Sequence, residues 1–238
     1  MKLFVPVLND SSLLPHFLKH YDLLGVKTFY IAANADIVET VRRDAAGFDA
    51  VIRDDLDVAE SIHGASAITA LRLECSRDDE WVLIADVDEF LAAETHIPTV
   101  LARADEEGAN VVRGRMVDRV SIDGSFPAVL ETTNLWETFP RECGLTSKLQ
   151  GSVDHKGVLV RGHLMPTMAH HHFQDEHIAS QWLRLHHFKW NSNVRHRMQI
   201  AMEMTRALEI DWWVEYERIL QHLDTHGRLR WEDFPPPD

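Results

Sequence analysis

The segment that most constrains this chain reads Trp-Val-Leu-Ile-Ala-Asp-Val-Asp-Glu-Phe-Leu over residues 81–91. Its five-residue apolar run is typical of a buried strand, and the run ends in the carboxylates of Asp86, Asp88 and Glu89. Burying an unpaired carboxylate costs several kcal/mol, so these acids need a cationic partner or a metal ion. Two aspartates beyond a strand end can bind one divalent cation and leave positions open for phosphate oxygens. The segment therefore predicts a metal–diphosphate site, although a solvated turn or a helix cap at Asp88 also fits the pattern.

The composition is that of an acidic globular protein. The chain has 238 residues, 45% hydrophobic content and a formal net charge of −14, which suits one large α/β domain or two small ones. No basic stripe is visible, which argues against general binding to nucleic acid or to an anionic membrane. No apolar run reaches the roughly 20 residues of a membrane span, and the start lacks a signal-peptide pattern. Having two cysteines suits a reducing compartment, so we expect the cytoplasm or a membrane surface reached through partners.

Strand and helix signals alternate over the first half of the chain. The pattern predicts short strands at 3–8, 26–32, 50–52 and 81–85, and amphipathic helices at 13–24, 36–44 and 58–75. Such alternation indicates parallel βαβ units, in which ligands gather at the carboxyl ends of the strands. Polar side chains lie at or just after these ends, at Asn9, Asn34, Asp36, Asp54 and Asp86. They predict a ligand site along that edge.

The second half is less regular. We expect a helix at 100–106, a strand at 110–117, loops and short elements at 121–151, and strands at 158–160 and 167–173. From His177 onward, apolar residues at helical spacing predict helices, and no repeat or convincing linker interrupts the chain.

Three blocks of the chain resemble family 2-type glycosyltransferases, in the subgroup that carries Asp-Val-Asp-Glu-Phe-Leu. The first block runs from Leu14 to Asp36, the second from Glu80 to Leu91, and the third from Leu185 to Ser192. Together they span most of residues 1–200. Asp10 stands where the family usually has glutamate, and the helices after residue 200 have no match.

The resemblance implies an α/β protein with the GT-A fold, a Rossmann-like and mostly parallel central sheet flanked by helices, with a helical C-terminal segment. We expect a single domain over 1–238. It would comprise a nucleotide-sugar-binding half at 1–117, an acceptor-side half at 118–192, and C-terminal helices with a tail at 193–238.

The activity that the resemblance implies is metal-dependent transfer of a sugar, generally with inversion. The donor would be a nucleotide sugar of UDP or GDP type, and the acceptor a hydroxyl of a glycan or another molecule. Asp86 and Asp88 would hold Mn²⁺ or Mg²⁺ against the diphosphate, whose charge grows as the glycosidic bond breaks. The other residues that would contact the donor or acceptor are Asn9, Asn34, Asp36, Asp54, His63 and Lys148.

The candidates for the general base are acidic residues that follow the metal motif in the sequence. Asp175 and Glu176 lie at about the family's separation from that motif, so one of them would deprotonate the acceptor. They would equally suit the N-terminus of a helix beginning near His177. Asp154 is an alternative base.

Three histidines are candidates for a neutral third metal ligand, since imidazole suits Mn²⁺. His187 resembles a late histidine that GT-A enzymes often use. In the strand expected at 167–173, alternate residues share a face, so His170 and His172 would point together. For each of the three, a core or surface position is the plainer explanation.

Other classes of protein fit less well. A metal-dependent hydrolase would favour a His-x-His or His-Asp pair early in the chain, which the sequence lacks. A metal-dependent nucleotidyltransferase would favour a glycine-rich, basic loop after the first strand to hold a triphosphate, whereas the sequence there is Asn9-Asp10-Ser11-Ser12. A non-catalytic GT-A relative that binds nucleotide sugar stays open as well.

Overall fold

The computed structural model describes residues 1–56 and 64–237, which form two compact units. Unit 1 consists of Met1–Arg115 and His155–Leu185, and unit 2 of Met116–Asp154 and His186–Asp238. Unit 1 holds the Asp-x-Asp segment and unit 2 the C-terminal helices.

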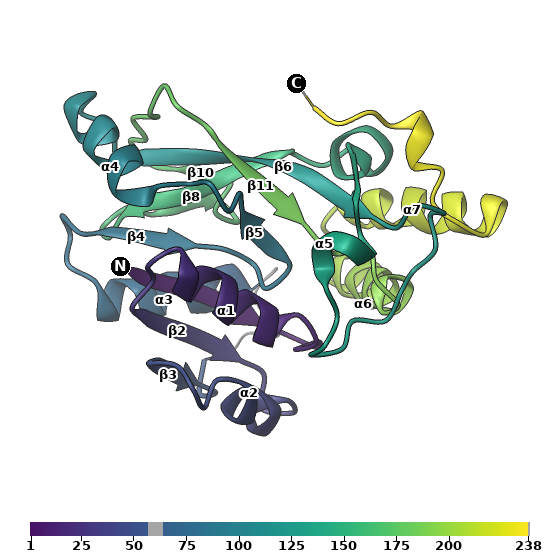
Figure 1. Cartoon of the computed structure of the whole chain (residues 1–238), viewed down its shortest axis with the longest axis horizontal. Helices are drawn as coiled ribbons and strands as arrows, with labels where there is room; N and C mark the ends of the chain where they lie inside the picture. The colour runs from purple at the N-terminus through teal and green to yellow at the C-terminus, as the bar shows by residue number, and fades with distance from the viewer. Residues whose placement is uncertain (57–63, 238) are drawn as a thin grey trace. The chain divides into compact units, whose positions relative to one another are not determined.

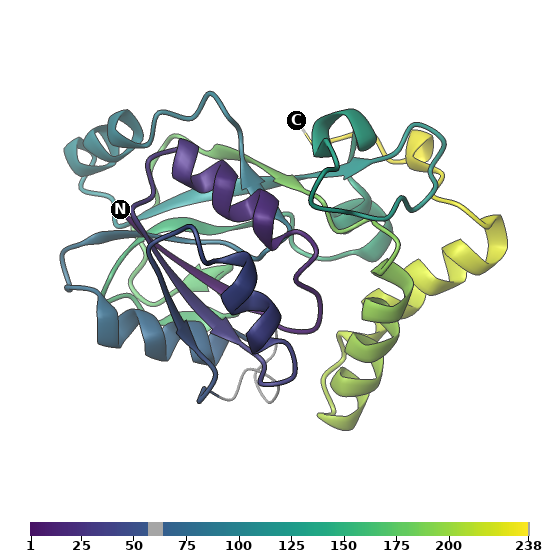
Figure 2. The same ribbon diagram turned by 60° about the horizontal axis from the view of Figure 1, so that its bottom comes forward.

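The first half of unit 1 is built from parallel βαβ units (Figure 1). Its strands pair in the order β3-β2-β1-β4, which is the order of a Rossmann-like half-sheet. Because such crossovers are right-handed, α1 and α2 lie on one side of these strands and α3 on the other (Figure 2). The elements are β1 (Lys2–Val7), α1 (Leu14–Leu23), β2 (Thr28–Ala33), α2 (Val38–Asp44), β3 (Ala50–Arg53), α3 (Ala65–Cys75) and β4 (Trp81–Ile84).

Antiparallel strands complete the sheet. The order continues β4-β8-β6-β11-β5, and the pairs β4–β8 and β8–β6 are antiparallel. A separate hairpin of β9 and β10 carries the histidine-rich segment. The bounds are β5 (Glu89–Leu91), α4 (Ile97–Glu106), β6 (Val111–Val120), β8 (His155–Arg161), β9 (Pro166–Met168), β10 (His172–Phe173) and β11 (Leu183–His187). The predicted α/β class, with a central sheet flanked by helices, is confirmed; parallel pairing is concentrated in the first four strands.

Alternation along the strands explains the core of unit 1. Phe4, Val82 and Ile84 are fully buried and pack against Ile68 and Leu71 of α3. These side chains recur every second residue in the strands and at helical spacing in α3, as the sequence pattern predicts. The part of the expected helix at 58–63 lies outside the described residues.

Two expected elements are wrong. Residues 183–187 form β11 and no helix begins at His177, because Leu183 and Leu185 alternate with the exposed Arg184 and so fit a strand as well as a helix. The strand expected at 167–173 is a hairpin, since Ala169 and His170 have positive φ values of 38° and 65° and turn the chain. His170 and His172 therefore do not share one strand face.

Unit 2 holds the predicted helical C-terminal segment. Its core joins Trp190, Val194 and Met198 to Ile219 and Leu223 across the pair of helices α6 and α7. β7 pairs with the C-terminal end of β6, with Asp118 opposite Cys143. The elements are α5 (Leu135–Thr138), β7 (Arg141–Cys143), a π-helix (Leu145–Gln150), α6 (Val194–Ala207), α7 (Trp213–His226) and a 3-10 helix (Trp231–Asp233).

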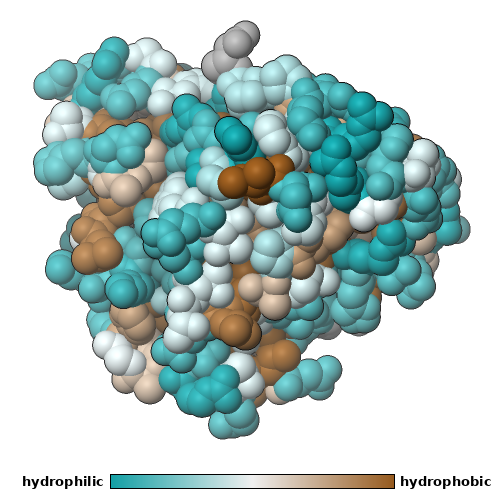
Figure 3. Space-filling model, turned by 45° about the vertical axis from the view of Figure 1, so that its right-hand side comes forward, coloured by the Kyte–Doolittle hydropathy of each residue, from teal (hydrophilic) through white to brown (hydrophobic). Residues whose placement is uncertain are grey.

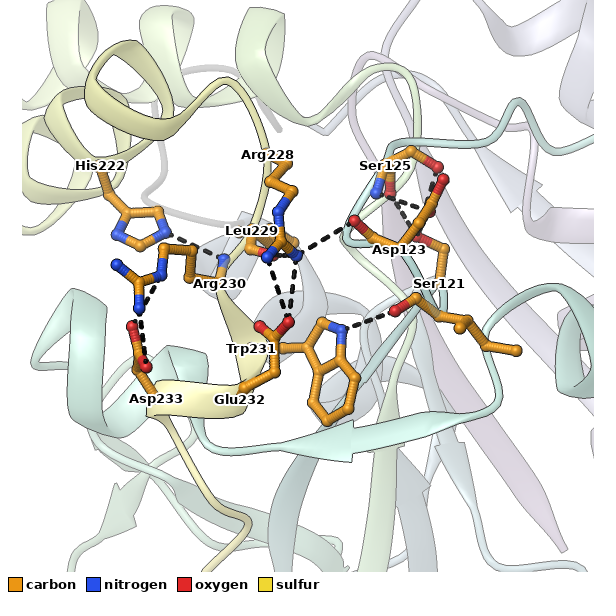
Figure 4. Close-up of polar contacts among 11 residues, drawn as sticks. Ser121, Asp123, Ser125, His222, Arg228, Leu229, Arg230, Trp231, Glu232 and Asp233 are labelled. Carbon is orange, nitrogen blue, oxygen red and sulfur yellow. Dashed lines mark hydrogen bonds and ion pairs between the residues drawn. The ribbon is translucent and has the colours of Figure 1, made fainter.

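The segment after α7 is bound to the turn that follows β6 (Figure 4). Trp231 donates its indole N–H to the Ile122 carbonyl at 3.0 Å, and the Leu229 N–H donates to the Gly124 carbonyl at 2.9 Å. Arg228 donates to the Asp123 carbonyl at 3.2 Å. Residues 228–231 are therefore held to this turn by main-chain and side-chain hydrogen bonds.

We expect Gly124→Ala to destabilise unit 2. An added Cβ would lie 2.1 Å from the Leu229 carbonyl oxygen, and φ at this residue is +74°. Strain and overpacking together should lower the free energy of unfolding by about 2–4 kcal/mol. Gly108→Ala is the matched control, since φ there is +66° and nothing lies within 4 Å of the new Cβ. Urea unfolding of both variants checks this, and equal losses would contradict the packing argument.

Large apolar side chains at the surface are dispersed. On the face in Figure 3, hydrophobic residues are scattered among hydrophilic ones, and isolated exposed apolar residues are normal for a globular protein. No helix in the described part of the chain is long and apolar enough to cross a membrane.

Candidate active site

The carboxyl ends of the four parallel strands of unit 1 carry the predicted polar residues. Asn9 follows β1 and Asn34 follows β2, and the Asn34 amide donates to the Asn9 amide oxygen at 3.3 Å. Asp36 is exposed ahead of α2, and Asp54 follows β3, where it forms an exposed ion pair with Arg42 at 2.9 Å. The structure thus brings Asn9 and Asn34 into contact. His63 lies outside the described residues.

The acids after β4 surround a buried lysine. Lys156, the second residue of β8, has a side chain only 3% exposed, and its Nζ lies 3.0 Å from Asp86 Oδ2 and 2.9 Å from Glu89 Oε2. Glu89 is equally buried, and its Oε2 also accepts the Asp86 backbone N–H at 2.8 Å. Burial alone would lower the pKa of Lys156, but the charges of Asp86 and Glu89 raise it above the ordinary value. The lysine is therefore charged and supplies part of the neutralisation that the sequence requires.

The Asp86–Asp88 pair has the chemistry of a site for a hard cation. Asp86 is 36% exposed at its side chain and Asp88 is half-buried. The Lys156 ammonium group donates a hydrogen bond to Asp86 Oδ2 at 3.0 Å, so the Asp86 carboxylate already interacts with one positive charge. Among the described residues there is no group of three or more His, Cys, Asp or Glu placed to hold a metal. Mg²⁺ is commonly bound by one or two carboxylates together with substrate phosphates, so the pair fits an ion that binds with a diphosphate.

His170 interacts electrostatically with Lys156 and Asp86 of this acid cluster. It is almost fully buried, with Nε2 3.4 Å from Thr69 Oγ1. Burial, followed by the positive charge of Lys156, lowers the pKa of His170 to about 3. The imidazole is neutral at physiological pH, which a metal ligand must be.

His172 and Glu176 belong to a second polar cluster in unit 1. Arg113 of β6 lies 2.7 Å from Glu176 Oε1 and donates to His172 Nδ1 at 3.0 Å. Asp175 is exposed and has a φ of +50°, which is uncommon outside glycine. Since no helix begins at His177, the helix-capping explanation for Asp175 and Glu176 is removed.

An aromatic side chain adjoins this cluster. The Trp182 ring lies 5.0 Å from the Arg115 guanidinium and 5.3 Å from the His155 ring. The Trp182 side chain is half-buried among these polar groups.

His187 and Lys148 belong to unit 2. Asp118, which is fully buried, has its Oδ1 3.2 Å from His187 Nδ1 and accepts from Trp190 Nε1 at 2.8 Å and from Thr146 Oγ1 at 2.7 Å. Lys148 is exposed and donates to the Pro235 carbonyl at 2.6 Å. Their predicted contacts with metal or substrate stay predictions.

The sequence reasoning missed three buried charged residues, Lys156, Arg113 and Asp118. Arg113 and Asp118 lie in β6 and Lys156 lies in β8, and a charge inside a strand is seldom buried without a partner. Their neighbours include His155, Gly114 and Arg119, so no uninterrupted apolar run marks these positions as buried.

Comparison of the chain with protein-family models and with curated proteins gives no match. Among solved structures, the 4-diphosphocytidyl-2C-methyl-D-erythritol synthase of Anaerococcus prevotii aligns with a TM-score of 0.41 and 10% identity, over 87% of this chain and 95% of that chain. A Bacillus anthracis protein described as a glucose-1-phosphate thymidylyltransferase aligns with a TM-score of 0.38 and 12% identity, over 71% and 78% of the two chains. Scores this low do not decide the function.

Proposed function

We propose that this protein is a metal-dependent glycosyltransferase, which moves a sugar from a nucleoside-diphosphate donor to an acceptor hydroxyl. The observation that carries the proposal is the placement of Asp86 and Asp88 directly after β4, at the edge where Asn9 and Asn34 also lie. Open α/β sheets bind ligands at that edge. The carboxylates would hold Mn²⁺ or Mg²⁺, and this ion would stabilise the charge of the departing diphosphate.

The remaining donor contacts follow the same edge. Asn9 and Asn34 offer amide donors and acceptors for a base, and the exposed Asp36 and Asp54 offer acceptors for ribose hydroxyls. Lys148 is proposed to contact the acceptor, and His170 and His172, which belong to the same unit as Asp86, are candidates for a third metal ligand. Of these, His170 has the support of a neutral imidazole whose pKa responds to the charges of Lys156 and Asp86.

Asp175 is the general base that we favour, with Glu176 as the other candidate. Glu176 is already engaged by Arg113, which lies 2.7 Å from its Oε1, so this carboxylate is less available to an acceptor hydroxyl. Asp175 is exposed, with an uncommon backbone conformation of the kind that clusters at functional sites. In an inverting transfer, the acceptor oxygen bonds to the anomeric carbon, the bond from that carbon to the diphosphate oxygen breaks, and the acceptor proton passes to the base.

Nucleotidyl transfer is the second candidate. Its support is Lys156, a buried cation at the metal edge that could contact phosphates although the first strand's exit lacks a lysine. A relative that binds nucleotide sugar without turnover is the third reading.

Nucleotide binding should depend on the metal. We expect UDP or GDP to raise the melting temperature with Mn²⁺ present and to leave it unchanged without Mn²⁺, because the two aspartates would repel the diphosphate unless a cation lies between them. Thermal-shift titrations with UDP, GDP and nucleoside triphosphates check this. Stabilisation by a triphosphate without metal would favour nucleotidyl transfer.

Hydrolysis of a panel of nucleotide sugars would then identify the donor. Binding of a nucleotide sugar without any turnover would indicate a non-catalytic protein.

A further inference from the structure

Lys156 is placed opposite the metal motif by strand pairing. β8 runs antiparallel to β4 with Leu159 opposite Leu83, and continuing this register brings Lys156 level with Asp86. The ammonium group contacts both Asp86 and Glu89, at 3.0 Å and 2.9 Å. Glu89 in turn accepts the Asp86 backbone N–H. The lysine and the glutamate thus fix the backbone and the carboxylate of Asp86 together.

This arrangement affects how readily Asp86 can bind a second cation. A divalent ion on Asp86 would lie near the Lys156 ammonium, and two cations repel strongly where water is largely excluded. Lys156 is 3% exposed at its side chain, so solvent screens this repulsion poorly. A nucleoside diphosphate carries several negative charges, which would offset the repulsion when ion and nucleotide bind together.

We propose that Lys156 is a positioning residue that couples the two binding events, so that Asp86 and Asp88 take the divalent ion only together with the diphosphate. The inference rests on the proposed function and adds to it that the ion and the donor bind cooperatively. In this arrangement Asp86 and Asp88 bind the ion, whereas Glu89 remains the ion-pair partner of Lys156.

The test measures Mn²⁺ binding itself, by titration calorimetry and by the electron paramagnetic resonance signal of free Mn²⁺, with and without UDP or GDP. Wild type should bind Mn²⁺ at least about tenfold more tightly with nucleotide than without, a ratio within the range of ordinary coupling energies. Equal Mn²⁺ affinity with and without nucleotide in the wild type would overturn the proposal without any variant.

The variants remove the coupling cation while keeping the charge balance. Lys156→Met alone would leave Glu89 as a buried unpaired charge, so the informative protein is the double variant Lys156→Met/Glu89→Gln. Without nucleotide, the double variant should bind Mn²⁺ more tightly than wild type. The ratio of its Mn²⁺ affinities with and without nucleotide should be about tenfold smaller than the wild-type ratio. Lys156→Arg, which keeps the charge, should retain most of the wild-type ratio.

The possible failures are distinguishable. If wild type binds no Mn²⁺–nucleotide complex at all, the proposed function fails and the coupling fails with it. If wild type binds the complex with coupling and the double variant keeps the same ratio, Lys156 is only a structural partner of Glu89, and the proposal alone is overturned.

Discussion

Asp88→Asn should lower the rate of sugar transfer by about a thousandfold, because a metal ion on the leaving diphosphate supplies several kcal/mol and each 1.36 kcal/mol is a factor of ten. Asp88 is chosen over Asp86 because Asp86 also holds Lys156, so its loss would disturb a buried ion pair as well. An asparagine at this position would keep the shape of the side chain and lose the charge. Initial rates with a saturating nucleotide sugar at fixed Mn²⁺ measure the effect.

Asp79→Asn is the matched control for this experiment. Asp79 precedes the same strand at its opposite end, and its side chain is 87% exposed, so its replacement should change neither transfer nor melting temperature beyond experimental error. If Asp88→Asn retains more than about a tenth of the wild-type rate, the carboxylate supplies less than about 1.4 kcal/mol and the metal assignment fails. A loss of melting temperature in Asp88→Asn alone would point to a structural role instead.

The Rossmann-like half of the fold was predictable because each of its helices and strands is encoded by a pattern of residues that are close together in the sequence. β1, β2 and β4 are short apolar runs, α1 and α2 carry apolar residues at helical spacing, and the order of these elements follows from short right-handed connections. The edge that carries Asn9, Asn34 and Asp86 followed from the same reasoning, since the carboxyl ends of parallel strands share one edge. Boundaries moved by a few residues, as at β2, which begins at Thr28 where the pattern placed Val26.

The partners of the buried charges were not predictable in the same way. Lys156 lies 70 residues from Asp86 along the chain, and His187 lies 69 residues from Asp118. Both pairings depend on contacts between distant strands, which no local period encodes. The failure at β11 has a different cause, since its few apolar residues fit a period of 2 and a period of 3.6 equally well.

Asp118→Ala should be the most damaging substitution in unit 2, lowering the free energy of unfolding by about 3–5 kcal/mol, the usual cost of removing one partner from a buried charged network. Its carboxylate accepts from the Thr146 backbone N–H at 2.6 Å, from the Thr146 hydroxyl and from the Trp190 indole, and it pairs with His187. Alanine would leave these buried donors without an acceptor. Equilibrium unfolding in urea measures the loss, and Asp224→Ala, at an ion pair whose carboxylate is 67% exposed, should cost less than about 1 kcal/mol.

The loss caused by Asp118→Ala should depend on pH in a defined direction. Burial alone would raise the pKa of Asp118, but the hydrogen bond and charge of His187, together with Lys189, lower it below the ordinary value. A carboxylate whose pKa is lower in the folded than in the unfolded state stabilises the fold fully above the unfolded value of about 3.9, and this contribution is lost as pH falls through the folded value. The difference between wild type and Asp118→Ala should therefore be largest near neutral pH and shrink below about pH 3.9. A difference that grows on acidification would mean that Asp118 is protonated in the folded protein, and the buried network would then owe its stability to the neutral acid.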